Sequence, residues 1–350
     1  MLRACWSLLL AIPAATALPR TAHRRAEEGA SSFAIMMDAG SSGTRAHVYS
    51  WPSDADCPSR LSSQLVVEIG EGEQITPGIS FFAPTNCSGV GPYLEPLINF
   101  ALAAVPEAAH SSTPLYLQAT AGMRLLPEDQ QAALLGAVRD AFAASPFATR
   151  PEDALVVSGD VEGANEWTAV NYLRGALGGP DKSKINKAAP AGVLGMGGAS
   201  TQIAFVPLEG TTLKAGAFPV AFEGLAEIEL YVHSYLGLGT TEAQRSLQTY
   251  LASRHPDGQD RRRLGEVPAV ADPCLLDDYS VTLPVGPGGT QVRLEGSSDS
   301  AACRAAIRSS LVNTDAPCPL TPCSFDGVYQ VGFKLKTMDF TLNLTGFMLK

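Results

Sequence analysis

Residues 33–49 read FAIMMDAGSSGTRAHVY, and this stretch decides the fold. Phe33 to Met37 is a short apolar run with strand character, and residues 45–49 alternate polar and apolar side chains. A Gly- and Ser-rich loop, residues 38–44, separates the two. The stretch therefore predicts a β-hairpin with a loop that is free to approach a ligand.

The same pattern returns in the second half of the chain. Residues 191–194 are apolar, residues 195–201 (GMGGAST) form a second Gly-rich loop, and residues 202–206 alternate again. Strands at 115–117 and 155–157 and helices after Pro127 and after Ser158 are predicted between the hairpins. Residues 252–300 contain Arg, Pro and Gly and are interpreted as an irregular insertion. The repeat indicates an internal duplication, with two α/β domains whose glycine hairpins face a shared cleft.

Composition and charge limit the classes of ligand. The chain has 350 residues, enough for two domains, and 45% hydrophobic against 17% charged residues, as in globular proteins. Its formal net charge of -10 disfavours nonspecific binding to nucleic acid or to anionic lipid. If the ligand is a polyphosphate, backbone N–H groups, a few Arg side chains and a metal ion must hold it.

The N-terminus has the features of a secretory signal. Arg3 precedes an apolar run from Ala4 to Ala14, and Ala15-Thr16-Ala17 fits a cleavage site. We expect a signal peptide at 1–17 and a disordered leader at 18–31; a signal anchor is the alternative. The sequons at Asn86 and Asn343 are usable only in the secretory pathway. The sequence thus predicts a secreted, extracellular or Golgi protein.

Cysteine usage agrees with export. Six of the seven cysteines remain after removal of residues 1–17, an even number as a disulfide framework requires. Their order suggests the neighbouring pairs 57–87, 274–303 and 318–323, although fifteen pairings are possible. None forms a CxxC pair, and the five His are scattered, so no zinc site is predicted.

The first loop suggests a phosphate site beside a metal ion. The Gly and Ser residues of 38–44 let the backbone approach phosphate oxygens closely. Asp38, at the strand end, is suited to a hydrated hard cation. An ordinary hairpin turn is the alternative, but the matching loop in the second half argues against it.

Three further residues have the chemistry that phosphoryl transfer needs. Thr120 and Arg124 follow the strand at 115–117 and should lie on the same side as the loops; a structural ion pair is the alternative for Arg124. Glu162, at the start of a helix, is interpreted as a general base that takes a proton from attacking water. A helix-dipole role is the alternative for Glu162, and Asp160 could fill that role instead.

Four segments carry a specific resemblance. Residues 38–45 (DAGSSGTR), 119–124 (ATAGMR), 161–173 (VEGANEWTAVNYL) and 195–205 (GMGGASTQIAF) resemble successive signature segments of the ectonucleoside triphosphate diphosphohydrolase family, the apyrases and nucleoside diphosphatases. Residues 229–239 and 318–330 also resemble the family, so the resemblance covers about 33–330. It implies an α/β fold of two RNase H-like domains, as in the actin and sugar-kinase superfamily, around a nucleotide cleft. The expected domains are 32–165 and 166–330, the second incomplete.

The resemblance also implies an activity and a site. The activity is hydrolysis of terminal phosphates of nucleoside tri- or diphosphates with Ca²⁺ or Mg²⁺. Glu162 matches the catalytic base, Ser200 and Gln202 match residues that position the attacking water, and Asp38 and Thr120 match positions around the hydrated ion. Trp167 matches an aromatic position, but its spacing indicates a core residue. The expected phosphate-binding residues are Gly40, Ser41, Ser42, Gly43, Thr44, Arg45, Thr120, Arg124, Gly197, Gly198 and Ala199.

The chain departs from the family pattern in two places. Gly195 stands where the family usually has an aspartate that helps hold the metal's water shell, so metal binding and rate should suffer. Residues 331–350 show no resemblance, and we interpret them as an aberrant tail from a retained intron or a faulty gene model; a genuine divergent tail is the alternative. We then expect missing C-terminal sequence, through which a membrane association is possible.

These departures motivate two alternatives to the hydrolase. The first is a catalytically impaired nucleotide-binding relative, in which Gly195→Asp should raise activity. The second is a polyphosphate phosphatase or sugar kinase of the same superfamily, which the export features argue against. Nucleoside di- and triphosphates are the expected partners, with no nucleic acid and no protein partner inferred.

Overall fold

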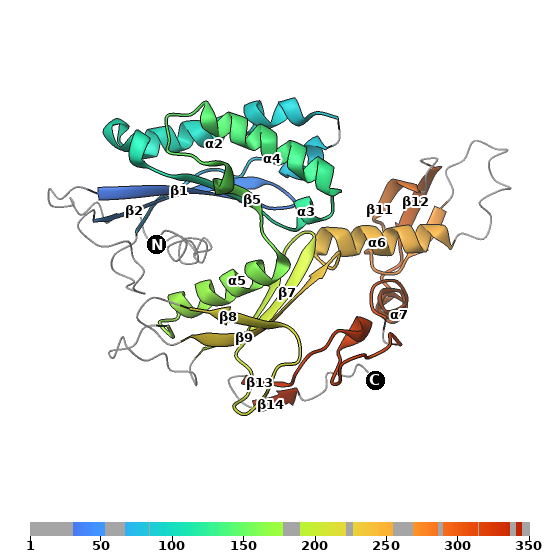
Figure 1. Ribbon diagram of the computed structural model, residues 1–350. Coiled ribbons are helices and arrows are strands. Elements are labelled where there is room, and N and C mark those ends of the chain that lie inside the picture. Colours follow the sequence, from blue (N-terminus) through green and yellow to red (C-terminus); the bar gives the residue numbers. More distant parts are fainter. Residues whose placement is uncertain are drawn as a thin grey trace. The chain divides into compact units, whose positions relative to one another are not determined.

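The computed structural model describes residues 31–52, 67–83, 85–177, 190–221, 227–254, 269–285, 290–313, 315–336 and 341–344. The chain divides into two compact units, Met1–Leu236 and Gly237–Lys350 (Figure 1). The predicted signal peptide, most of the predicted leader and Cys57, with its predicted pairing to Cys87, lie outside the described residues. No described helix is long and apolar enough to cross a membrane.

The first sheet of unit 1 has the strand order β3-β2-β1-β4-β5. β1 pairs with β2 antiparallel, which forms the predicted hairpin with Asp38 opposite Arg45, whereas β4 pairs parallel with both β1 and β5. The bounds of these strands are Ser31–Ala39 (β1), Thr44–Pro52 (β2), Val67–Glu71 (β3), Leu115–Ala119 (β4) and Ala154–Val156 (β5).

Helices α2 (Val90–Ala104) and α4 (Glu128–Ala143) lie together over one face of this sheet (Figure 1). Their apolar faces join the strands in a core that includes Ile35, Leu94 and Leu134, all fully buried. The short helix α3 (Ala121–Arg124) follows β4 directly. Four 3₁₀ turns complete this part at Ile79–Phe82, Cys87–Gly89, Glu107–Ser112 and Pro151–Asp153.

The second sheet of unit 1 repeats the hairpin. Its order is β6-β7-β9-β8, all antiparallel, and β6 and β7 place Gly195 opposite Gln202. The bounds are Val193–Met196 (β6), Ser200–Phe205 (β7), Ala217–Val220 (β8) and Ile228–Leu236 (β9). The mixed α/β class predicted from the sequence is confirmed, and so is the recurrence of the strand–loop–strand pattern.

Helix α5 (Gly159–Leu173) covers this second sheet. It begins at Ser158, whose hydroxyl accepts a hydrogen bond from the N–H of Val161 and so caps the helix. Trp167 is fully buried in the core between α5 and the sheet, as predicted. The buried face fixes the rotation of the helix, which decides where its polar residues point.

Unit 2 contains a three-stranded sheet of order β10-β12-β11. Its elements are α6 (Thr240–Ser253), β10 (Ala269–Asp272), β11 (Ser280–Val285), β12 (Thr290–Gly296), α7 (Ser300–Ser310), a 3₁₀ turn at Phe325–Gly327, β13 (Phe333–Lys336) and β14 (Thr341–Leu344). The expectation that 252–300 is irregular is therefore wrong. Val292 and Leu294 alternate with polar residues along β12 and are buried, which gives this sheet its own small core.

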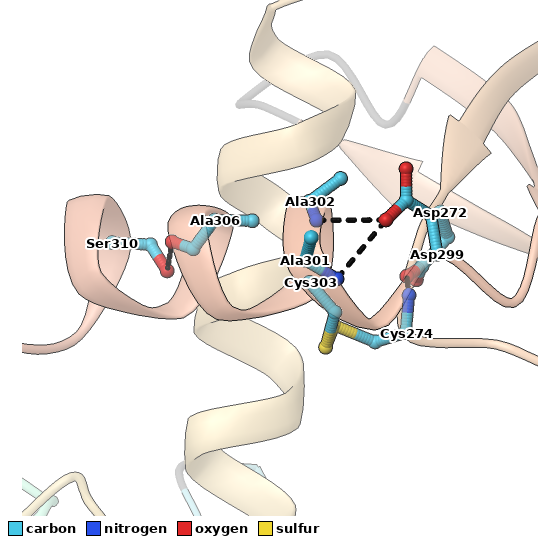
Figure 2. The surroundings of a disulfide bond; sticks show 8 residues. All are labelled: Asp272, Cys274, Asp299, Ala301, Ala302, Cys303, Ala306 and Ser310. Atoms are coloured by element: carbon cyan, nitrogen blue, oxygen red, sulfur yellow. Dashed lines mark hydrogen bonds between the residues drawn. A yellow bond between two sulfur atoms is a disulfide. The ribbon is translucent and has the colours of Figure 1, made fainter.

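Disulfides link parts of unit 2. The Cys274–Cys303 bond joins the loop after β10 to α7, and Asp299 caps α7 by accepting hydrogen bonds from the N–H groups of Ala301 and Ala302 (Figure 2). The Cys318–Cys323 bond closes a short loop further on. Two of the three predicted pairs are thereby confirmed.

Candidate active site

A cavity of about 280 Å³ in unit 1 brings the two hairpin loops together. The first loop lies between β1 and β2, the second between β6 and β7, and α3 and α5 supply further side chains. The lining residues are Asp38, Gly40, Ser41, Ser42, Gly43, Arg45, Gln74, Thr120, Ala121, Glu162, Glu166, Met196, Gly197, Gly198, Ala199 and Ser200.

Close backbone packing holds the first loop. A Cβ on Gly43 would lie 2.5 Å from the Ile75 carbonyl oxygen, so only glycine fits without a shift. The N–H of Thr120 donates to the Ala39 carbonyl at 3.1 Å, which fixes the start of α3 beside the end of β1. Asp38 and Thr120 are therefore neighbours, as the sequence predicts for a shared cation site.

Glu162 lies at the centre of a polar network. Its Oε2 accepts hydrogen bonds from Arg124 Nη2 at 2.7 Å and from Gln202 Nε2 at 3.0 Å. Gln202 also donates to the hydroxyl of Ser200, and Arg124 Nη2 lies 3.1 Å from the same hydroxyl. These contacts bring together the base and both water-positioning residues that the sequence analysis names.

Three carboxylates around the cavity have raised pKa values. Desolvation is the main cause for each of Asp38, Glu162 and Glu166. Asp38 faces the open cavity, but the protein that surrounds it still raises its pKa, against the attraction of His47 and Arg45. Arg124 partly offsets the rise at Glu162. At Glu166, the charges of Glu162 and Asp38 add to desolvation and raise the pKa to about 7.

Three predicted site residues do not line the cavity. Thr44 is fully buried: its hydroxyl accepts a hydrogen bond from Tyr93 at 3.0 Å, and its N–H donates to Ile75. Gln202 lies buried beneath Ser200, and Arg124 pairs with Glu162, which is the ion pair weighed as its alternative role. Arg45 lines the cavity while it pairs with Glu71 at 3.1 Å.

Four lining residues were not predicted: Gln74, Ala121, Met196 and Glu166. Glu166 has a usable sequence signal, because it lies four residues after Glu162 and helical spacing puts both on one face. Gln74 has no such signal, because it enters the site from a segment that ordinary sequence patterns do not link to the loops.

The cavity suits a hydrated divalent cation. Within the described residues, no group of three or more His, Cys, Asp or Glu side chains is arranged to ligate a metal directly. Three carboxylates nevertheless share one small cavity, and Glu166 Oε2 is wholly buried without a hydrogen-bond partner in the described part of the chain. Hydrated Mg²⁺ or Ca²⁺ binds through few carboxylates and several waters, so the donor set fits such an ion.

The chain belongs to the GDA1/CD39 (nucleoside phosphatase) family, whose model matches residues 24–344. It is 32% identical to a guanosine-diphosphatase of Schizosaccharomyces pombe over 86% of this chain and 53% of that protein. It is 37% identical to ectonucleoside triphosphate diphosphohydrolase 5 of Gallus gallus over 63% of this chain and 51% of that protein. The chain spans about half the length of the curated relatives it matches.

A solved structure shares the fold. A nucleoside triphosphate hydrolase from Neospora caninum superposes with a TM-score of 0.57 at 16% identity, covering 81% of this chain and 66% of that one. The family match extends beyond residue 330, where the quoted resemblance stops. The domain bounds 32–165 and 166–330 and the origin of residues 331–350 stay predictions.

Proposed function

We propose that this cavity hydrolyses the terminal phosphoanhydride bond of nucleoside di- or triphosphates. The observation that carries the proposal is the Glu162 carboxylate, held by Arg124 and Gln202 at a cavity between two glycine hairpin loops. Water attacks the terminal phosphorus, the bond to the bridging oxygen breaks, and a nucleotide with one phosphate fewer leaves with inorganic phosphate. The family and the names of the relatives support this class of reaction.

Glu162 acts as the general base. Its carboxylate takes the proton of the attacking water, for which a carboxyl with a raised pKa is better suited than an ordinary one. Ser200 and Gln202 lie within hydrogen-bond distance of each other, and Gln202 also bonds Glu162, so they orient the base and the water. Arg124 keeps Glu162 ionised until it accepts the proton.

The hairpin loops hold the phosphates. Backbone groups of Gly40–Gly43 and Gly197–Ala199 form opposite walls of the cavity, and Arg45 stands at its edge. Asp38 and Thr120 are the residues that would hold the water shell of Ca²⁺ or Mg²⁺. When bound, the ion neutralises phosphate charge, which an acidic cavity in a chain of net charge -10 otherwise repels.

The test compares two carboxylates in the first turn of α5. Glu162→Gln should reduce phosphate release from ATP and GDP by at least about 100-fold, the usual size of a general-base effect. Asp160→Asn removes a charge from the same turn but not from the cavity, so it should keep most of the activity. Release should stop when EDTA removes Ca²⁺ and Mg²⁺. A Glu162→Gln enzyme with wild-type rates would contradict the role of the base.

A catalytically impaired nucleotide-binding protein is the second candidate function. Gly195 favours it, because the second hairpin lacks the carboxylate that Asp38 gives the first. This candidate predicts that nucleotide raises the unfolding temperature while no phosphate is released. Phosphate release that depends on Glu162 would exclude it.

We further propose that the protein works in the secretory pathway. The disulfides of unit 2 need an oxidising compartment, and one relative is named Golgi apyrase. Nucleotides are the proposed partners.

A further inference from the structure

The two hairpins place Asp38 and Gly195 at the same position. Asp38 ends β1 opposite Arg45, and Gly195 lies in β6 opposite Gln202, with a loop of matching length between the paired residues. A side chain at 195 would thus face the cavity as Asp38 does. The second hairpin has no side chain there.

Another carboxylate occupies the space above Gly195. A Cβ built on Gly195 would overlap both oxygens and the carboxyl carbon of Glu166. Glu166 comes from α5, one turn after Glu162, and both line the cavity. The carboxylate absent from the strand is therefore replaced in space by one from the helix.

Glu166 has no structural role that explains its position. Its Oε2 is buried, and no described residue donates a hydrogen bond to it. A buried oxygen without a partner costs stability, and like charges one helical turn apart repel each other. A bound cation would offset both costs, and such an oxygen in a native fold calls for that kind of explanation.

We propose that Glu166 supplies the second carboxylate of the cation site, opposite Asp38, in the place that Gly195 leaves open. The inference rests on the proposed function for the identity of the ligand, a hydrated Ca²⁺ or Mg²⁺. Glu166 and Gly195 then form a matched pair: the glycine makes room for the glutamate. Gly195→Asp alone would displace Glu166 and should not improve the site, unlike the expectation from sequence alone.

The experiment measures ion binding directly. Mn²⁺ serves as the probe, with free Mn²⁺ followed by electron paramagnetic resonance in the full chain without nucleotide. Glu166→Gln should weaken Mn²⁺ binding by about 10- to 100-fold, as loss of a residue supporting a metal site does. Wild-type affinity in Glu166→Gln would overturn the proposal.

A pair of double variants tests the exchange of positions. Glu166→Ala with Gly195→Asp moves the carboxylate from α5 to β6 and should recover most of the affinity. Glu166→Ala with Gly195→Ala is the matched control, which differs by one carboxylate and should bind as weakly as Glu166→Gln. Equal affinity of the two double variants, with both folded by thermal unfolding, would also overturn the proposal. Because binding needs no turnover, this result is independent of the hydrolysis test with Glu162→Gln.

Discussion

Arg124 is the residue through which pH should act on catalysis. Its guanidinium donates to Glu162 and to the Val157 carbonyl, and it opposes the desolvation that raises the pKa of Glu162. The ionised base thus depends on a single neighbouring cation. The pair is mostly buried, with 13% of the Arg124 side chain and 18% of the Glu162 side chain exposed, so solvent screens it little.

Arg124→Met should move the acidic limb of the pH profile of kcat/KM to higher pH. Without the guanidinium, desolvation alone sets the pKa of Glu162, which rises further, so the base is ionised only at higher pH. Arg124→Lys keeps the charge and should shift the limb less. An acidic limb that stays in place in Arg124→Met would show that Glu162 does not control it.

Glu166 should make the metal-free protein less stable as pH rises. Its folded pKa of about 7 exceeds the model value of 4.5, so the favoured protonated form is lost between about pH 4.5 and 7. Glu166→Gln should therefore match the wild type near pH 4.5 and exceed its free energy of unfolding at pH 8, by at most about 3 kcal/mol. Thermal unfolding in EDTA measures this. Identical pH dependence in both proteins would contradict the burial of an ionised Glu166.

The site residues differ in how far the sequence predicts them. Glu162, Ser200 and Asp38 lie in segments with a local pattern, and the structure brings them to one cavity. Glu166 escapes prediction because its importance depends on the empty space at Gly195, a contact between a helix and a strand that no local pattern encodes. Thr44 lies in the same glycine loop but is buried, because the hairpin pairing turns its side chain towards Tyr93.

Among the elements, α5 links the core to the chemistry. One face packs on β7 and β9, with Gly163 so close that a Cβ would lie 2.8 Å from Val232 Cγ1. The neighbouring face presents Glu162 and Glu166 to the cavity. The distance between helix and sheet therefore sets the position of both carboxylates.

Gly163→Ala should lower both stability and activity. The added methyl group has no room and should cost about 1–3 kcal/mol, even though alanine favours helices. Gly136→Ala in α4 is the matched control, because a Cβ there has nothing within 4 Å, and it should stabilise by about 0.5–1 kcal/mol. Urea unfolding and phosphate release compare the two. A neutral Gly163→Ala would contradict the close approach of α5.

Elements were predictable where a pattern repeats. The two hairpins share a strand–loop–strand pattern, so each supports the interpretation of the other. Strands β10 to β12 were missed because Pro, Gly and Arg around them suggest irregular chain. The alternation at Val292 and Leu294, both buried, is the signal that identifies the last of them.

For the whole molecule, the two units differ in what stabilises them. Unit 1 has an extensive apolar core, whereas the buried cluster in the described part of unit 2 consists of Ala252, Val292 and Leu294. The Cys274–Cys303 bond ties α7 to the chain around that small cluster. Unit 2 should therefore depend more on its disulfides.

Replacing Cys274 and Cys303 by alanine should destabilise unit 2 by about 3 kcal/mol, the usual effect of a loop of this length. Hydrogen exchange should speed up across 269–310 and stay unchanged across 90–173. Reduction of the wild type should reproduce this pattern. Equal acceleration in both ranges would show that the units do not unfold separately.

Hydrolysis in ¹⁸O-labelled water tests the central claim most directly. The account predicts that wild-type protein with GDP and Ca²⁺ releases phosphate carrying one solvent oxygen, leaves the GMP unlabelled, and that Glu162→Gln yields almost no product. Label in GMP would place the attack on the other phosphorus atom. Release of labelled phosphate at an undiminished rate by Glu162→Gln would contradict water activation by Glu162.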